Sequence, residues 1–325
     1  VAADRNDLQG RERMAQKEDF VELADKTPDW LRHALNVALR LKRQWKQTSR
    51  NDPLLAGKVL VCIFEKPSLR TRVSFETAMV HLGGSTIYIS PGEIGMGKRE
   101  SAPDVARVLS GMVDGIMARV FEHEKLRALA AHATVPVING LSDYSHPCQA
   151  MADLMTIEEH FGRLEGLTLA YIGDGNNVAR SLLVACAKFG LNFRIATPPG
   201  YELDGEIGDR VSGPHPGLDF ASAHAPEEAV HGADIIYTDT WVSMGQEAEK
   251  AERLPLFQAF QINEALLSRA PKQAIVMHCL PAYRGVEITD EVLDGKRSLV
   301  FAQAHNRLHF QKGLLEVLMG PPGER

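Results

Sequence analysis

The stretch 64–84 carries side chains that can bind an anion. The apolar run KVLVCIF (58–64) predicts a strand, and the apolar spacing from Val73 to Leu82 predicts a helix that stops at Gly83-Gly84. The turn and first helical turn between them carry the cationic and hydroxyl side chains of Lys66, Ser68, Arg70, Thr71 and Arg72. Together with the free N–H groups of a helix N-terminus, these groups suit a phosphate. The alternative is that the arginines are solvated and Ser68 only caps the helix.

Further cationic and polar residues follow predicted strands. Arg119 lies at the end of GIMARV (115–120), where a guanidinium among apolar neighbours needs an anionic or carbonyl partner, or else a structural ion pair. Ser145-His146-Pro147 can cap and begin a helix, which would place His146 and Gln149 on one face. A histidine and an amide donor aimed at one point could polarise a carbonyl group. A purely structural histidine is the alternative.

The segment IGDGNNVARS (172–181) matches a dinucleotide-binding fingerprint only in part. Gly173 and Gly175 fit the pattern, but Val178 occupies the third glycine position. Asn176 and Asn177, at the predicted helix start, could instead hold a carboxylate or only cap the helix.

Two candidates follow later strands. Asp239 ends the run ADIIYTD (233–239) and could pair with a substrate ammonium, with the loop Ser243-Met244-Gly245 close to it. A helix-cap acid in a plain loop is the alternative. Cys279 ends a further apolar run and could either line the same site or be a buried inert thiol.

The last predicted helix supplies Arg307, within QAHNRLHF (303–310). His305 and His309 lie four residues apart in the same segment, but the sequence offers no third ligand. We therefore predict no metal site there.

Length and composition limit the function classes. The chain has 325 residues, 44% of them hydrophobic, which favours two domains with sizeable cores. The formal net charge of -6 argues against nucleic acid or a membrane surface as the partner, and no apolar run approaches the ~18 residues of a spanning helix. Four cysteines without metal spacing or a disulfide framework indicate a reducing cytoplasm. Residues 1–13 are expected to be a flexible extension.

Strand-like and helical segments alternate along the chain. Thr27-Pro28-Asp29 predicts the start of a helix that runs through about Trp45, and a second long helix is predicted from about His146 to His160. The strand-like runs lie at 58–64, 85–90, 115–120, 135–139, 167–173, 192–197, 233–239, 274–280 and 299–304. This alternation predicts an α/β protein of two doubly wound α/β domains with parallel sheets, joined by interdomain helices. The expected domains are 14–147, with the C-terminal helix 306–325 packing back on it, and 148–305.

Several of these motifs together resemble the aspartate and ornithine carbamoyltransferase family, in the family's order, from about Asp19 to Leu318. SLRT (68–71) is similar to the carbamoyl-phosphate motif usually written STRT, HPCQ (146–149) to the second substrate motif, and HCLP (278–281) to the third. TDTWVSMG (238–245) resembles the D-x-x-x-SMG loop of the ornithine-using members, which the aspartate enzymes lack.

The resemblance implies a transferase that moves the carbamoyl group of carbamoyl phosphate to the side-chain amine of L-ornithine, giving L-citrulline and phosphate without a cofactor or metal. Residues 14–147 would bind carbamoyl phosphate and 148–305 would bind ornithine. Carbamoyl phosphate would be held by Ser68, Leu69, Arg70, Thr71, Arg119, His146, Gln149, Cys279, Leu280 and Arg307. The catalytic residues among them would be Arg119, His146, Gln149, Cys279 and Arg307. Ornithine would be held by Asn177, Asp239, Ser243 and Met244. The resemblance also implies a homotrimer or a multiple of trimers, and we expect a cytoplasmic protein with neither nucleic acid nor a membrane as partner.

Three residues depart from the family pattern. Leu69 replaces the first Thr of STRT, His305 stands where many members have Glu, and Gly95 falls where some members send a Gln or His into the neighbouring subunit's site. The alternatives are a sister enzyme that uses putrescine or an N-acylated ornithine, and a non-enzymatic family member that binds a ligand. A dinucleotide-dependent dehydrogenase would instead use the segment 173–177.

Overall fold

The structure is a computed structural model of the chain. It describes residues 17–97, 99–204, 207, 211, 215, 217–242 and 246–321. The predicted extension 1–13 and the predicted ornithine ligands Ser243 and Met244 lie outside these residues. Within the described ranges, no helix combines the length and the apolar composition that crossing a bilayer demands.

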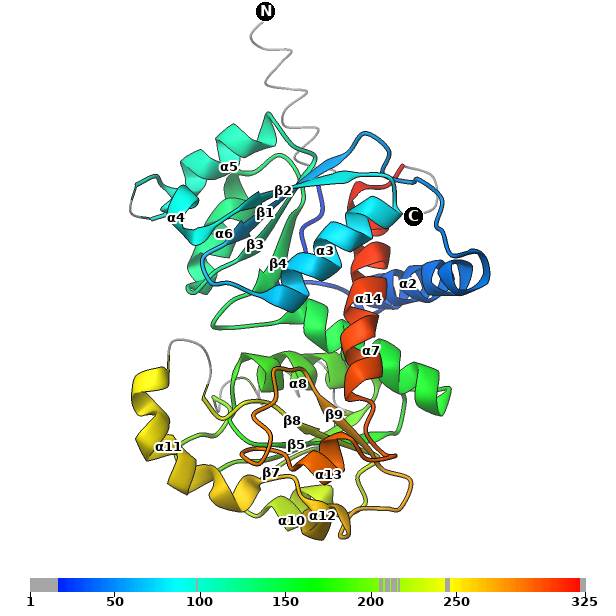
Figure 1. Cartoon of the computed structure of the whole chain (residues 1–325), viewed down its shortest axis with the longest axis vertical. Helices are drawn as coiled ribbons and strands as arrows, with labels where there is room; N and C mark the ends of the chain where they lie inside the picture. Colours follow the sequence, from blue (N-terminus) through cyan, green and yellow to red (C-terminus); the bar gives the residue numbers. More distant parts are fainter. Residues whose placement is uncertain are drawn as a thin grey trace, which may run out of the picture. The chain divides into compact units, whose positions relative to one another are not determined.

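The chain divides into two compact units (Figure 1). Unit 1 contains the residues up to 148 together with those from 307 onward, and unit 2 contains residues 149–306. The chain leaves unit 1 within helix α7 (Pro147–Phe161) and returns to it within helix α14 (Val300–Met319). Each unit has its own parallel sheet and buried core, which confirms the predicted α/β fold class.

Unit 1 is built on a four-stranded parallel sheet with the strand order β2-β1-β3-β4. Its strands are β1 (Val59–Phe64), β2 (Ser85–Ile89), β3 (Gly115–Arg119) and β4 (Val137–Leu141). Its further helices are α2 (Pro28–Thr48), α3 (Leu69–His81), α4 (Pro91–Ile94), α5 (Ala102–Ser110) and α6 (His123–His132). Apolar residues of α5 and α6 pack in one cluster with sheet residues, and Figure 1 shows both helices on the same side of the sheet.

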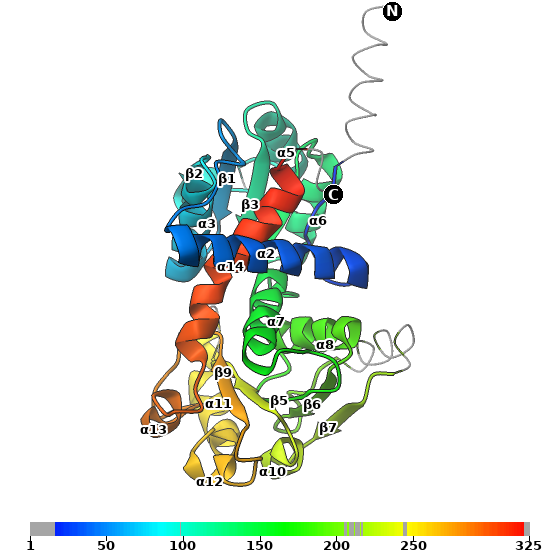
Figure 2. The same cartoon turned by 90° about the vertical axis from the view of Figure 1, so that its right-hand side faces the viewer.

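Helix α2 begins as its sequence predicts. Thr27 is the N-cap, and its hydroxyl oxygen accepts a hydrogen bond from the Trp30 N–H at 3.2 Å, while Pro28 fits the first helical position. Helix α14 crosses α2 (Figure 2), and a Cβ atom at Gly313 would lie 2.6 Å from the backbone nitrogen of Ala38. A residue without a side chain at 313 therefore permits this close crossing.

Unit 2 is built on a five-stranded parallel sheet with the strand order β7-β6-β5-β8-β9. Its strands are β5 (Thr168–Ile172), β6 (Asn192–Ala196), β7 (Phe220–Ala223), β8 (Ile235–Thr238) and β9 (Ile275–His278). Its further helices are α8 (Asn177–Phe189), α10 (Pro226–Val230), α11 (Lys250–Phe257), α12 (Glu264–Leu267) and α13 (Asp290–Leu293), with short 3-10 helices at Glu247–Glu249 and Gln258–Phe260. Helices α10 to α13 contribute to one buried cluster with the sheet, and Figure 1 shows α7 and α8 on the opposite face.

One predicted strand is wrong. The run LVFAQA (299–304) lies almost entirely in helix α14, which begins at Val300 rather than near residue 306. Short apolar runs lack a decisive period, so strand and helix are hard to distinguish there. The fifth strand of unit 2 is instead β7, whose sequence FASA is too short and too weakly apolar to be recognised. The other eight predicted strands are present, with ends that differ by one or two residues.

The sheet registers bring residues that are distant in sequence to one edge. In unit 1, Phe64 at the end of β1 is the register partner of Arg119 at the end of β3. In unit 2, Thr238 at the end of β8 is the partner of both Ile172 and His278. The residues that follow these positions therefore leave each sheet from its carboxyl edge, where ligands of parallel α/β sheets bind.

Helix α14 carries two further buried basic side chains in unit 1 after Arg307. His309 is 9% exposed, and Lys312 is fully buried. The Lys312 Nζ donates to Asn51 Oδ1 at 2.7 Å and lies 5.0 Å from the centre of the Trp45 ring, and burial lowers the pKa of Lys312 to about 8. The pKa of His309 is lowered to about 3, first by burial and then by the positive charges of Lys312, Lys42, Lys46 and His81.

We expect acid to destabilise the fold through His309. Its pKa is lower in the folded protein than the ordinary value of 6.5, so the unfolded chain binds the proton more tightly, and stability is lost as the pH falls from about 6.5 toward 3. Between about pH 7 and about pH 4.5, the unfolding temperature of His309→Leu should therefore fall less than that of the wild type. His305→Leu, which changes an exposed histidine of the same helix, is the matched control and should follow the wild type. An equal fall in all three proteins would contradict the expectation.

Candidate active site

The N-terminus of α3 lies directly after strand β1 and a four-residue turn, 65–68. Ser68 is the N-cap, and its Oγ accepts a hydrogen bond from the Thr71 N–H at 3.4 Å. Ser68 Oγ also lies 3.2 Å from Thr71 Oγ1, so the two hydroxyl groups share a hydrogen bond. The side chain of Leu69 is 74% exposed, so this position offers the helix end a backbone N–H group and no hydroxyl.

Thr71 lies at the centre of a polar cluster in unit 1. Its buried Oγ1 accepts hydrogen bonds from Arg119 Nη1 at 3.2 Å and from Arg307 Nη2 at 3.3 Å. Arg307 Nη1 lies 3.4 Å from His146 Nε2. A guanidinium only donates, so Nε2 is the acceptor and the proton of the neutral ring is on Nδ1. Four side chains of unit 1 thus lie together. They are Thr71 of helix α3, Arg119 of strand β3, Arg307 of helix α14 and His146, the residue before α7.

Positive charge is concentrated around this histidine. The pKa of His146 lies well below its ordinary value, first because of burial and then because of the charges of Arg307, Arg119, Lys66 and Arg70. Burial and the charge of Arg119 also lower the pKa of Lys66. Cations held this close repel one another, and an anion with two negative charges would offset that repulsion.

Lys66 is a member of this cluster that the sequence analysis did not include among the ligands. Its side chain is 9% exposed, and its Nζ lies 4.4 Å from the centre of the Phe121 ring. The sequence signal was present, because Lys66 lies in the anion-binding stretch two residues before Ser68. Sequence alone does not separate a buried lysine from a solvated one.

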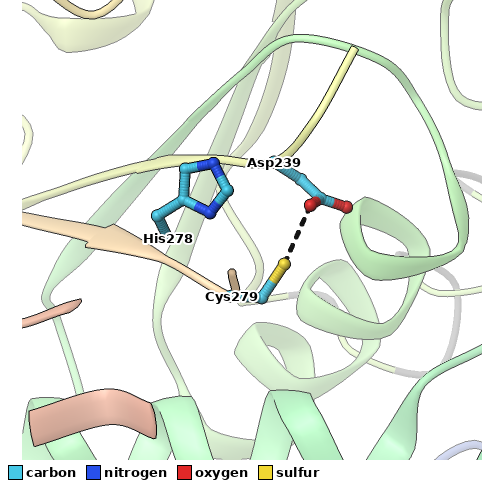
Figure 3. A group of neighbouring side chains, drawn as sticks. All are labelled: Asp239, His278 and Cys279. Atoms are coloured by element: carbon cyan, nitrogen blue, oxygen red, sulfur yellow. Dashed lines mark hydrogen bonds between the residues drawn. The ribbon is translucent and has the colours of Figure 1, made fainter. Parts of the chain in front are cut away.

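A second polar cluster lies at the carboxyl edge of the unit 2 sheet. Asp239 follows β8 and is buried. Its Oδ1 accepts hydrogen bonds from the Thr240 N–H at 2.7 Å and from the Cys279 thiol at 2.9 Å, and its Oδ2 accepts one from Asn176 Nδ2 at 3.1 Å. Figure 3 shows the Cys279 sulfur directed at this carboxylate. A buried carboxylate held in this way can bind an ammonium group.

Asn176 fixes the orientation of Asp239. The Asn176 Oδ1 caps helix α8 by accepting from the Val178 and Ala179 N–H groups at 2.9 Å and 3.1 Å, which turns its NH₂ group toward Asp239. The sequence analysis considered Asn176 only as a cap or a carboxylate ligand, because a contact between the ends of β5 and β8 is not visible in sequence. Asn177, the predicted ornithine ligand, is half-buried at the first position of α8.

The geometry at 173–177 does not favour a dinucleotide. A Cβ atom at Gly175 would lie 2.5 Å from backbone atoms of Glu202 and Leu203, so the chain itself requires this glycine. Asp174 in the same turn pairs with the buried Arg253. Burial raises the pKa of Asp174 to about 6, although the charge of Arg253 opposes this rise.

Asp239, His278 and Cys279 form a possible metal-ligand group within the described residues, with one potential ligand atom of each inside 4.8 Å of the others (Figure 3). Both ring nitrogens of His278 are engaged, however. The Leu280 N–H donates to Nδ1 at 2.9 Å, so Nε2 carries the proton and donates to Glu287 Oε1 at 3.2 Å. A metal ion would have to break this arrangement, which argues against a metal site here.

The remaining predicted ligands, Leu280 and Gln149, lie in unit 2. Leu280 has a φ angle of +59°, a left-handed conformation that costs about 1–3 kcal/mol for a residue with a side chain and often marks functional sites. Gln149 is buried on α7, and its Nε2 donates to Asp153 Oδ1 at 2.8 Å.

Fold and site together define a two-domain α/β protein with a cationic cluster suited to an anion in one unit and a carboxylate suited to an amine in the other. Comparison with known proteins identifies the family. The carbamoyl-P binding domain of aspartate/ornithine carbamoyltransferase matches residues 18–159, and the Asp/Orn binding domain of the same family matches residues 165–318. The chain therefore belongs to the aspartate/ornithine carbamoyltransferase family.

Similar proteins extend over nearly the whole chain. The ornithine carbamoyltransferase of Carboxydothermus hydrogenoformans is 50% identical over 305 residues, which cover 93% of this chain and 97% of the relative. A relative from Pyrococcus furiosus, named an anabolic ornithine carbamoyltransferase, is 48% identical over 304 residues, 93% of this chain and 96% of its own length. Among solved structures, ornithine carbamoyltransferase from Pyrococcus furiosus has a TM-score of 0.89 at 48% identity, with 93% of this chain and 97% of that chain covered.

We expect phosphate to stabilise the protein and Arg70→Ala to remove most of this effect. A ligand that binds only the folded state raises the unfolding temperature, and Arg70 is one of the charges that act on His146. Arg72→Ala is the matched control, because Arg72 pairs with Glu76 at 2.9 Å and lies 3.9 Å from the centre of the Tyr88 ring. Inorganic phosphate should raise the unfolding temperature of Arg72→Ala as much as that of the wild type. Equal increases in the unfolding temperatures of Arg70→Ala and Arg72→Ala would show that Arg70 does not contribute to phosphate binding.

Proposed function

We propose that the protein acts as an ornithine carbamoyltransferase, converting carbamoyl phosphate and L-ornithine to L-citrulline and phosphate. The observation that carries this proposal is the cluster of Lys66, Arg70, Arg119 and Arg307 around the neutral His146. The relatives named ornithine carbamoyltransferase support the choice of second substrate. The neutral side-chain amine attacks the carbonyl carbon, the carbon–oxygen bond to phosphate breaks, and the proton lost by the amine leaves with the phosphate.

Carbamoyl phosphate would bind in unit 1. Ser68, Arg70, Thr71 and the Leu69 N–H would hold the phosphate at the N-terminus of α3, where the helix dipole favours an anion. Arg119, Arg307 and His146 would act on the carbamoyl group. Because His146 is neutral, it would donate a hydrogen bond to the developing oxyanion without contributing a full charge, which the arginines supply.

Ornithine would bind in unit 2. The carboxylate of Asp239 is suited to an ammonium group, and Cys279 and Asn176 hold that carboxylate in place. The first turn of α8, where Asn177 lies, is suited to the α-carboxylate. The roles of Ser243 and Met244 toward ornithine, and those of Gln149, Cys279 and Leu280 toward the carbamoyl group, stay predictions.

We infer functional domains with the limits 14–147 plus 306–325 and 148–305. The limits of the two compact units and of the two family domains are consistent with this division. A reducing cytoplasmic compartment is consistent with the four buried free cysteines. Thiol labelling of the denatured protein directly after cell lysis should find all four reduced, and a cysteine already oxidised in the cell would argue against this compartment.

The function is tested by an assay that measures the carbamoylated amine, which is citrulline when ornithine is the substrate. Carbamoyl phosphate is offered with ornithine, putrescine, N-acetylornithine, N-succinylornithine or aspartate in parallel. We expect ornithine to be strongly preferred, and Arg70→Ala to lower turnover by at least ~100-fold, as loss of a charged contact to the transition state usually does. Preference for another amine would keep the chemistry and overturn the second substrate. Phosphate binding without activity toward any amine would favour a non-enzymatic role.

A homotrimer is supported by apolar side chains exposed on one part of unit 1. Strand β2 is the edge of its sheet, and Ile87 on β2 is 50% exposed, as are Val73 (52%) and Val80 (66%) on α3. Light scattering should give three times the chain mass of 35.8 kDa. We expect Ile87→Asp to shift the protein toward smaller species, while Phe301→Asp, at a position 53% exposed in unit 2, should leave the mass unchanged. A monomeric wild type would rule out the trimer.

A further inference from the structure

A carboxylate, an imidazole and a hydroxyl group form a buried chain of hydrogen bonds in unit 1. Glu22 Oε1 lies 2.8 Å from His123 Nε2, and His123 Nδ1 lies 2.7 Å from Ser142 Oγ. All three side chains are buried, and they come from the stretch before α2, the first residue of α6 and the turn after β4. We call these three residues the buried relay. The same order of groups activates the nucleophile of serine hydrolases.

The proton positions along the buried relay follow from its first member. A carboxylate only accepts, so His123 Nε2 carries a proton and donates it to Glu22. In the neutral ring Nδ1 is then an acceptor, and the Ser142 hydroxyl donates to it. The backbone oxygen of Ser145, at 3.4 Å from Ser142 Oγ, is a much more distant acceptor. The Ser142 oxygen in turn accepts the Ser145 N–H at 3.2 Å.

The buried relay does not make Ser142 a nucleophile. This residue is fully buried, and its oxygen already accepts a backbone N–H group. A nucleophilic hydroxyl must instead meet a substrate within hydrogen-bond reach. The relay therefore holds the turn in which Ser142 lies, residues 142–145.

His123 contacts three consecutive residues of this turn. Its ring accepts the Ser142 hydroxyl, and its backbone N–H donates to Asp143 Oδ1 at 3.0 Å. The centre of the same ring lies 5.1 Å from the centre of the Tyr144 ring. The start of α6 thus fixes the turn by one backbone contact and two side-chain contacts.

The turn is also closed on itself, and it ends directly before His146. The Ser142 N–H donates to the Ser145 oxygen at 3.0 Å, opposite the bond from the Ser145 N–H to Ser142 Oγ. The Ser145 hydroxyl oxygen lies 3.0 Å from Nδ2 of Asn139, a fully buried residue of β4. A displacement of Ser142 would therefore be passed along the turn to the backbone of His146.

We propose that the members of the buried relay are positioning residues for carbamoyl transfer, acting through His146. The relay fixes the turn, and the turn fixes the point from which the His146 ring meets Arg307, 3.4 Å from its Nη1. All of these residues belong to unit 1. This inference rests on the proposed function, in which His146 acts on the carbamoyl group. A misplaced His146 weakens the reaction geometry more than substrate binding, which the N-terminus of α3 provides.

The first test compares two substitutions of the carboxylate. Glu22→Leu removes the acceptor, so we expect kcat to fall by at least about 10-fold while the KM for carbamoyl phosphate changes by less than about 3-fold. Glu22→Gln should keep kcat within about 3-fold of the wild type. In the structure His123 Nε2 and Arg127 Nη2 both bind the same Glu22 oxygen, and the oxygen of a glutamine amide can accept from both.

Asp19→Leu is the matched structural control. Asp19 is a carboxylate of the same segment, but its Oδ1 accepts the Val137 N–H of β4 at 2.7 Å rather than a group of the turn, and it pairs with Lys17 at 3.1 Å. This variant should lower the unfolding temperature and keep the wild-type kcat. A kcat loss equal to that in Glu22→Leu would show that loosening of the segment explains both, which would overturn the proposal.

A double-mutant cycle tests whether the relay acts through His146. Ser142→Ala alone should lower kcat by at least about 10-fold, whereas adding it to His146→Ala should lower kcat by less than about 2-fold. Independent effects, whose fold-changes multiply, would overturn the proposal, as would an unchanged kcat in Ser142→Ala. If Ser142→Ala does not fold, Ser142→Cys, with a weakly donating thiol of similar size, takes its place in the cycle.

The proton positions are tested without any activity measurement. Nitrogen-15 NMR of the histidine-labelled wild type at about pH 8 should show His123 with a protonated Nε2 and an unprotonated Nδ1, assigned by the loss of these signals in His123→Asn. A protonated Nδ1 would overturn the relay even in a fully active enzyme. A wild type that shows the expected proton positions but is inactive toward every amine would instead overturn the proposed function and, with it, this inference.

Discussion

The main electrostatic constraint on unit 1 is the repulsion among the cationic side chains that surround the buried His146. Four positive side chains act on this histidine, and burial keeps it neutral. Such a concentration of positive charge is electrostatically unfavourable, and Thr71 helps to stabilise it, because its hydroxyl oxygen accepts from both Arg119 and Arg307. The folding energy of unit 1 therefore maintains a charge arrangement that a bound anion would relieve. In this way a chain with a net negative charge can carry a local cluster suited to an anion.

In unit 2, the parallel strand register brings the polar residues of the second cluster together. Thr238 stands between Ile172 and His278 in the sheet, so the residues that follow β5, β8 and β9 leave from adjacent points. Asp239 then meets Asn176 and Cys279 with little dependence on loop conformation. An enzyme that relies on positioning rather than on a strong base benefits from ligands anchored directly at strand ends.

The sequence predicts the strand ends better than the contacts made beyond them. The fold class and eight strands follow from apolar periodicity, and the anion-binding stretch follows from hydroxyl and guanidinium groups at a helix start. The strand prediction for 299–304 was wrong because a short apolar segment fits a strand and a buried helix equally well, and only tertiary packing decides between them. Lys66 and Asn176 were undervalued for a related reason. Their burial and partners depend on neighbouring strands, which local sequence does not report.

The Gln149 amide shows where sequence reasoning ends. Gln149 and Asp153 lie four residues apart on α7, yet which atoms of the amide face the carboxylate depends on the groups packed behind it. Tyr237 and Gln303, which are distant in sequence, decide this by supplying only donors to the carboxylate. An asparagine could fill the same space, but its own hydrogens would make two orientations of the network possible. A buried acceptor without hydrogens specifies a single orientation of its donors, and that specificity is a physical reason to bury a carboxylate in unit 2.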